Sequence, residues 1–222
     1  MSRNPKSILE LLQKPKGPYD FKGVGSPEYY LGGDIRIYYE GDSIVELSLS
    51  SKTYVKRICD KIKGLMGWKL KGYMNPMDPN FHAEIDDSNY LEGDDVSKYR
   101  MIVGSLNWLV TLGRYDIHYT VCTLARHMMM PRVGHMHAMR RVFGYLEQNY
   151  NFSINYNIRE PDFTMHKVES YDWFPLYGKV QEEEPYGMPE PKGMSVITNG
   201  FFDSSHASCL MTRRSTTCVL LF

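Results

Sequence analysis

Residues 32–66, GGDIRIYYEGDSIVELSLSSKTYVKRICDKIKGLM, contain the change of pattern that decides the fold. Ile35 and Ile37 alternate with polar residues, and Val45, Leu47 and Leu49 do the same after the turn-forming sequence EGDS. Period-two alternation on both sides of a turn predicts a β-hairpin. After the hairpin the apolar residues recur at helical spacing, so the sequence predicts a helix directly behind it.

This helix has two chemically distinct sides. Its apolar stripe consists of Tyr54, Val55, Ile58, Cys59, Ile62, Leu65 and Met66. Its opposite side is basic and carries Lys52, Lys56, Arg57, Lys61 and Lys63. A helix of this type buries the first side and presents the second to solvent or to an acidic partner.

Three more apolar stripes follow, within 99–110, 117–128 and 139–146. Their short connections, LGRYD and MPRVGH, favour antiparallel neighbours, so the sequence predicts a small helical bundle. We also expect a short helix over 7–13, opened by Asn4 and Pro5, and a strand at FSINY, 152–156.

Net charge is zero, but the charges are segregated. Residues 52–71 are basic with Asp60 as their one acid, whereas 78–95 contain acids and no Lys or Arg. Such faces either pair with one another on folding or meet a charged partner such as nucleic acid. There is no apolar run of about 20 residues and no signal-peptide pattern, so we expect an intracellular protein, cytoplasmic or nuclear and not secreted. The four scattered cysteines indicate buried thiols in a reducing compartment.

Three stretches lie in one order along the chain: PEYYLGGDIRI with LSLSSKTYVKRI (27–58), SKYRMIVGSLNWLVTLGRYDIHYTVCTLARHMMMPRVGHMHAMRRVFGYLE (97–147), and FFDSSHASCLMTRRSTTCVLLF (201–222). Together they resemble the C-terminal part of copia-type retrotransposon polyproteins, in which the reverse transcriptase runs into ribonuclease H. The resemblance covers nearly the whole chain.

The resemblance implies an α+β protein in four parts. Residues 1–51 would be the end of a polymerase palm, with a hairpin like the one that grips the primer strand. Residues 52–156 would be a helical thumb-like bundle, 157–194 a proline-rich and acidic linker, and 195–222 the first β-hairpin of a truncated ribonuclease H fold.

The resemblance also implies a catalytic remnant at Asp203, which is similar to the first metal-binding aspartate of ribonuclease H. The family's further acids are replaced here by Ser205 and Cys209, and we expect the paired aspartates of the polymerase to lie outside this chain. Two-metal chemistry needs several carboxylates around one phosphate. We therefore expect a catalytically inactive chain without a cofactor, although the intact family uses Mg²⁺. The acids at 86–87 and 94–95 fit solvated or helix-capping roles.

The expected partner is an RNA/DNA hybrid or another duplex, bound weakly and in a salt-dependent way; neither a membrane nor a small-molecule substrate is predicted. Candidate phosphate contacts are Lys52, Lys56, Arg57, Lys61, Lys63, Arg126, Arg140, Arg141, Arg213 and Arg214, with Arg114 and Arg132 nearby in the sequence. Arg213 and Arg214 fit a charged hairpin turn equally well. The candidate aromatic residues for stacking on bases are Tyr54, Trp68 and Trp108. Aromatic residues of this kind are more commonly part of the core.

Two alternatives belong to other classes of protein. The first is a helical interaction module without a nucleic-acid role, in which the acidic loop 78–95 docks onto the chain's own basic face. The second is a hydrolase that uses the histidines 118, 127, 135 and 137, but GHMHAMRR lacks the spacing of a zinc-binding helix.

Overall fold

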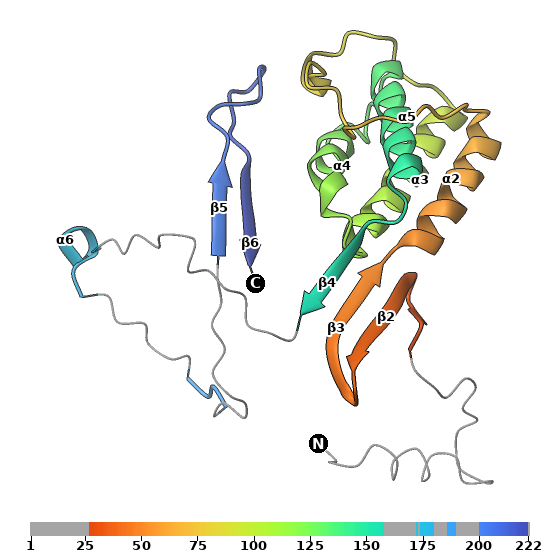
Figure 1. The fold of residues 1–222 in the computed structure, drawn as a ribbon. Helices are drawn as coiled ribbons and strands as arrows, with labels where there is room; N and C mark the ends of the chain where they lie inside the picture. The colour runs from red at the N-terminus through yellow and green to blue at the C-terminus, as the bar shows by residue number, and fades with distance from the viewer. Residues whose placement is uncertain (1–26, 158–171, 173, 180–185, 190–199, 222) are drawn as a thin grey trace. The chain divides into compact units, whose positions relative to one another are not determined.

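The computed structural model describes residues 27–157, 172, 174–179, 186–189 and 200–221. These residues form a mixed α+β structure with one four-stranded sheet and a group of helices, as the sequence predicts (Figure 1). Contacts divide the chain into two units, 1–79 with 89–158 and 80–88 with 159–222. The expected helix over 7–13 lies outside the described residues.

The sheet of the first unit is antiparallel, in the order β1-β2-β3-β4. Its strands are β1 (Tyr29–Tyr30), β2 (Gly33–Glu40), β3 (Ser43–Ser50) and β4 (Ser153–Asn157). The predicted hairpin is β2–β3, and its turn contains Gly41 at a φ of 60°, which glycine adopts without a steric penalty. The strand predicted at 152–156 is β4, which pairs with β3 and completes the sheet.

Four helices stand at one end of this sheet: α2 (Lys52–Met66), α3 (Asp94–Thr111), α4 (His118–Ala125) and α5 (Val133–Gln148) (Figure 1). All four were predicted from the apolar stripes. Their inward side chains form the core together with Ile117 of the 3-10 helix η2 (Tyr115–Ile117), and include Val55, Ile58, Ile62, Tyr99, Ile102, Leu106, Leu109, Leu124, Met139, Val142, Phe143 and Leu146. The Tyr99 hydroxyl donates a 2.7 Å hydrogen bond to the carbonyl of Leu124, which joins α3 to α4 inside the core.

The sheet meets the helices where α3 ends. Gly113 has a φ of 94°, and a side chain there would collide with Ile154 of β4. Only glycine combines this backbone conformation with so close an approach. The apolar face of the sheet can therefore come directly against the turn between α3 and α4.

The segment between α2 and η1 (Ala83–Ile85) is tied along α5. Arg140 donates to the carbonyl of Lys69 at 2.7 Å, and Arg141 donates to the carbonyl of Asn75 at 3.2 Å. Between these two bonds, the carbonyl of Lys71 lies against Gly144, where no side chain would fit. We call residues 67–79 the strap; it covers α5 and is held by two arginines.

The described part of the second unit includes 80–88 with the 3-10 helix η1 and the C-terminal residues 200–221. It contains the hairpin β5 (Gly200–Ser204) and β6 (Thr217–Leu221), where a strand pair was predicted, and the one-turn helix α6 (Phe174–Tyr177). Both strands of this hairpin are exposed, and Phe202 keeps 75% of its accessible surface.

Two expectations about burial need correction. Cys59 is buried, but Cys122 and Cys218 are exposed and Cys209 is half-buried, so the prediction of buried thiols holds for one cysteine in four. Trp108 is 41% exposed because it lies on the outer side of α3, next to the buried positions Leu106 and Leu109. Trp68 is half-buried and packs at an angle on the Phe143 ring.

Candidate nucleic-acid interface

The basic side of α2 is accessible. Lys56, Arg57 and Lys61 are exposed, and Lys52 is half-buried at the first turn. Asp60 is the acid between them, also exposed. The structure thus brings four of the predicted basic residues together on one helix.

Lys63 differs from the other basic residues of α2. Its ammonium forms an ion pair with Glu147 of α5 and lies 3.7 Å from Asp60. The hydrogen bond with Glu147 raises the pKa of Lys63, because it stabilises the charged ammonium. Lys63 joins two helices, so its proposed phosphate contact would compete with this ion pair.

The N-terminus of α2 is occupied by a carboxylate from the sheet. Asp34 of β2 accepts hydrogen bonds from the N–H and the hydroxyl of Thr53, at 2.8 and 2.6 Å. A helix N-terminus attracts anions through its free N–H groups and its dipole. Because Asp34 already fills this position, phosphate contacts at α2 depend on its side chains.

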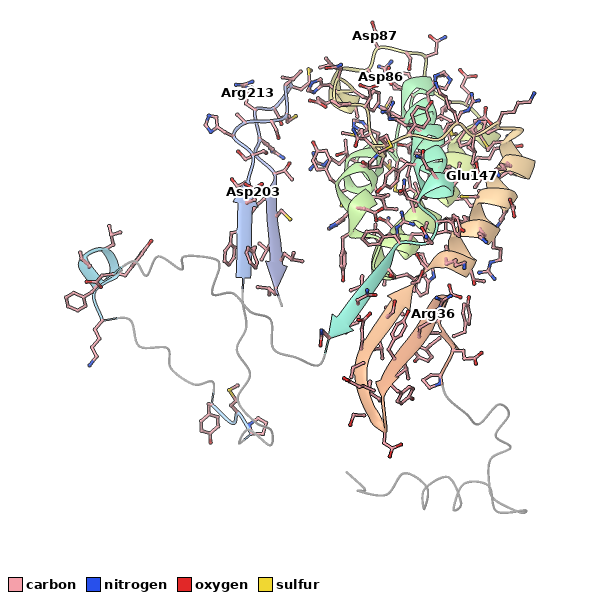
Figure 2. All side chains as sticks on the ribbon, viewed as in Figure 1. Arg36, Asp86, Asp87, Glu147, Asp203 and Arg213 are labelled. Carbon is pink, nitrogen blue, oxygen red and sulfur yellow. The ribbon has the colours of Figure 1, made fainter. Side chains whose placement is uncertain are left out.

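A groove of about 780 Å³ follows the polar face of the sheet up to this helix end. Arg36 lies in it, paired across the strands with Ser48, which pairs in turn with Asn155 (Figure 2). Lys52 lines the groove where it meets α2. Sequence reasoning did not select Arg36, although its position between Ile35 and Ile37 already placed it on the polar face.

Most of the later arginines make contacts within the fold. Arg126 is exposed at the end of α4, and Arg140 and Arg141 of α5 hold the strap. Arg141 also lies 3.3 Å from Asp78. Arg132 donates to the Tyr90 hydroxyl at 2.8 Å and lies over its ring.

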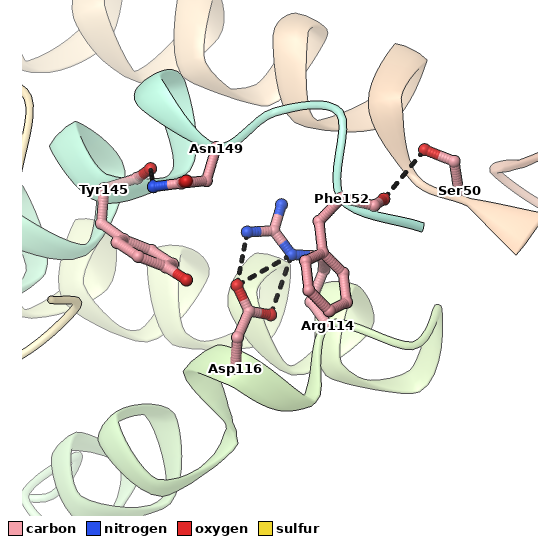
Figure 3. A network of polar contacts seen from close by, with 6 residues as sticks. All are labelled: Ser50, Arg114, Asp116, Tyr145, Asn149 and Phe152. Carbon is pink, nitrogen blue, oxygen red and sulfur yellow. Dashed lines mark hydrogen bonds and ion pairs between the residues drawn. The ribbon is translucent and has the colours of Figure 1, made fainter. Parts of the chain in front are cut away.

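Arg114 was considered as a phosphate contact, together with the basic residues of the later helices, and this expectation is wrong. Its side chain is 1% exposed and forms an ion pair with Asp116, with Nη2 2.6 Å from Oδ2 (Figure 3). The guanidinium also lies 5.5 Å from the centre of the Phe152 ring. Arg114 therefore has a structural role and cannot reach a phosphate in this fold.

Asp203 lies in β5, opposite Cys218 of β6, and its Oδ1 accepts the N–H of Ser204 at 2.8 Å. Arg213 lies in the loop of the same hairpin (Figure 2), and Arg214 follows it in that loop. Throughout the described part of the chain, no three His, Cys, Asp or Glu side chains gather closely enough to hold a metal ion. One exposed carboxylate with hydroxyl and thiol neighbours does not fit Mg²⁺, which prefers several oxygen ligands in octahedral geometry.

Several of the other acids and one of the histidines have local structural positions. Asp94 and Asp95 lie in the first turn of α3, as expected for acids that complement the helix dipole. Asp86 accepts the N–H of Ser88 in a turn. His135 is buried, and its Nδ1 accepts the N–H of Arg132, which caps the start of α5.

No helix in the described residues is both long and apolar enough to cross a bilayer. No model of a known protein family matches the chain, and no solved structure matches it.

The chain is similar to two transposon proteins and to one uncharacterized protein. A putative transposon Ty5-1 protein of Saccharomyces cerevisiae is 28% identical over 69% of this chain and 47% of its own length. The retrovirus-related Pol polyprotein from transposon RE1 of Arabidopsis thaliana is 28% identical over 77% of this chain and 11% of its own length. An uncharacterized mitochondrial protein of Arabidopsis thaliana is 25% identical over 90% of this chain and 64% of its own length.

These relatives confirm the predicted resemblance to retrotransposon polyproteins. The chain spans 47% of the length of the putative Ty5-1 protein and 64% of the uncharacterized mitochondrial protein. It spans 11% of the Pol polyprotein.

Proposed function

We propose that the chain is a reverse-transcriptase-derived fragment whose remaining function is to bind an RNA/DNA hybrid. In this proposal the β2–β3 hairpin is the end of the palm, the bundle α2–α5 is the thumb, and the β5–β6 hairpin is the start of a ribonuclease H fold. The order of hairpin, helices and second hairpin supports this assignment, as does the similarity to a transposon Pol polyprotein.

The single observation that carries the binding function is the basic side of α2. Lys56, Arg57 and Lys61 are exposed, and Lys52 joins this side to the groove that contains Arg36. Ammonium and guanidinium groups neutralise backbone phosphates without reading the base sequence. A duplex lying along α2 with one strand toward the groove would meet both sets of charges.

We further propose that the chain binds without catalysing a reaction. Asp203 is followed in the chain by Ser204 and Ser205 and lies opposite Cys218, and none of these residues supplies a second charged oxygen. Hydrolysis of a phosphodiester by two metal ions needs carboxylates that clamp both ions. In this hairpin the carboxylate of Asp203 accepts a hydrogen bond from the N–H of Ser204, which is a structural role.

The experiment is a binding titration of the whole chain with a short RNA/DNA hybrid across a series of salt concentrations. The proposal expects binding at low salt that weakens as a linear function of log salt concentration. No binding at low salt would overturn the proposal and favour the alternative of a helical interaction module. One observation favours that alternative: Asp78 of the acidic loop forms an ion pair with a basic residue, Arg141. This arginine belongs to α5, however, and not to the basic side of α2.

A further inference from the structure

Lys52 and Lys56 lie over one aromatic ring. Their Nζ atoms are 5.9 and 4.5 Å from the centre of the Tyr150 ring. The two lysines are four residues apart in α2, so their side chains leave the same face of the helix. Tyr150 comes from the connection between α5 and β4, about a hundred residues later.

The Tyr150 ring lies at the junction of two concave surfaces. With Lys56 and Glu147 it lines a cleft of about 320 Å³ between α2 and the end of α5. Lys52, which also lies over this ring, lines the groove of the sheet. Tyr150 is half-buried where α2 approaches the end of α5, and its ring meets the two ammonium groups there.

A ring in this position restricts the conformations of the two lysine side chains. A lysine side chain is flexible and loses rotamer freedom when it binds a phosphate. Attraction between an ammonium and the ring face offsets part of that loss before any ligand arrives. It also keeps two like charges close together, an arrangement that one anion between them would stabilise.

We propose that Tyr150 is a positioning residue that turns Lys52 and Lys56 into one binding site for a backbone phosphodiester. This inference rests on the proposed function, because it specifies where on the α2 surface a strand is held. The site lies at the point where the groove meets the helix, so a strand bound there would continue over the polar face of the sheet.

Two neighbours on α2 provide internal comparisons. Arg57 lies 5.2 Å from the centre of the Tyr54 ring, on the same helix, and is not linked to Tyr150. Lys61 forms no ion pair and lies over no ring among the described residues. Replacing Tyr150 should therefore leave the contributions of Arg57 and Lys61 unchanged.

The test measures hybrid affinity at one low salt concentration for the wild-type chain, Tyr150→Phe and Tyr150→Leu. Tyr150→Phe keeps the ring and should bind as the wild type does. Tyr150→Leu should bind about threefold more weakly, which is the size expected for an exposed cation–π contact. In a Lys52→Ala/Lys56→Ala background the same leucine substitution should have no effect, because the groups through which the ring acts are gone.

The outcomes separate this inference from the proposed function. If the wild-type chain does not bind the hybrid, the proposed function fails. If it binds but Tyr150→Leu equals Tyr150→Phe, or if leucine weakens binding equally in the double-alanine background, the positioning role is overturned.

A second measurement covers the case in which Tyr150→Leu does not fold. In NMR spectra of the wild-type chain, the Hε protons of Lys52 and Lys56 should be shifted upfield by the ring, relative to those of Lys61. Equal shifts for the three lysines would also overturn the inference.

Discussion

The side chain of Arg114 closes a bidentate ion pair with Asp116, two residues further along the chain. Nε donates to Oδ1 at 2.9 Å and Nη2 donates to Oδ2 at 2.6 Å. Both side chains are removed from solvent, at 1% and 14% exposure. The pair lies in the turn between α3 and α4, where Phe152 at the start of β4 covers it (Figure 3). It therefore stabilises the place where the helices and the sheet meet.

Replacing Asp116 by Asn should strongly destabilise the chain. It leaves a buried guanidinium without its counter-charge, and breaking a buried ion pair in this way costs about 3–5 kcal/mol. Urea unfolding measures the loss. The matched control is Asp95→Asn, which breaks the solvent-exposed pair with Lys98 and should cost about 0–1 kcal/mol. Equal losses in the two variants would contradict a structural role for the pair.

Gly144→Ala should release the strap. The added methyl group would overlap the carbonyl of Lys71 and touch the Tyr73 ring, and overpacking of this kind costs about 1–3 kcal/mol. Gly104→Ala on α3 is the control, because a side chain there meets no neighbour and should stabilise the helix by up to about 1 kcal/mol. Thermal unfolding distinguishes the two, and faster hydrogen exchange in 67–79 should accompany the first. A neutral Gly144→Ala would mean that the strap is not held against α5.

Stability should fall as the pH rises above about 9. Burial raises the pKa of the Cys59 thiol from 9.0 to about 12, with Glu147 adding to the effect. The unfolded chain then loses this proton at a lower pH than the folded chain does, so the stabilisation is complete below pH 9 and is lost between about 9 and 12. Burial likewise raises the pKa of Tyr99 from 10.0.

Urea midpoints measured across this pH range check the prediction. Cys59→Ala should flatten the first part of the decline, near pH 9–10, whereas an alanine at the exposed Cys122 should not. An unchanged slope in Cys59→Ala would show that another group controls the alkaline transition.

Local patterns in the sequence were sufficient for the longer elements, whereas the short elements β1, η1, η2 and α6 were not predicted. The hairpin β2–β3 was predictable because alternation and the EGDS turn lie next to each other, and the helices because each apolar stripe lies within one segment. The partner with which a strand pairs is not determined by the sequence of that strand alone. The strand at 152–156 was predicted. Its pairing with β3, about a hundred residues earlier, depends on how the intervening helices bring the chain back to the sheet.

The candidate site was less predictable, because a charged residue looks the same in the sequence whether it is free or paired. Arg114 is buried by Phe152 and Asp116, and Lys63 is turned to Glu147 on another helix. Arg140 and Arg141 hold the strap through backbone carbonyls, which any sequence supplies. Alternation placed Arg36 on the polar face of its strand, but the groove around it is completed by distant segments, and Tyr150 gave no signal of its own.

The chain should neither extend a primer nor cut the RNA strand of a hybrid when Mg²⁺ or Mn²⁺ is supplied. Hydroxyl groups at Ser204 and Ser205 are neutral and cannot replace the charged oxygens that two-metal cleavage requires. Asp203→Asn should accordingly leave a cleavage assay unchanged. Metal-dependent cleavage by the wild-type chain that disappears in Asp203→Asn would refute the proposal of an inactive fragment.

The most direct test of the account is the salt dependence of hybrid binding when the exposed basic side of α2 is removed. Lys56→Ala/Arg57→Ala/Lys61→Ala should bind more weakly, and its slope of log affinity against log salt should decrease by roughly one unit for each phosphate that the variant no longer neutralises. Lys98→Ala, on α3 and paired with Asp95, should keep the wild-type slope. A triple variant with the wild-type affinity and slope would contradict the central claim that α2 holds the nucleic acid.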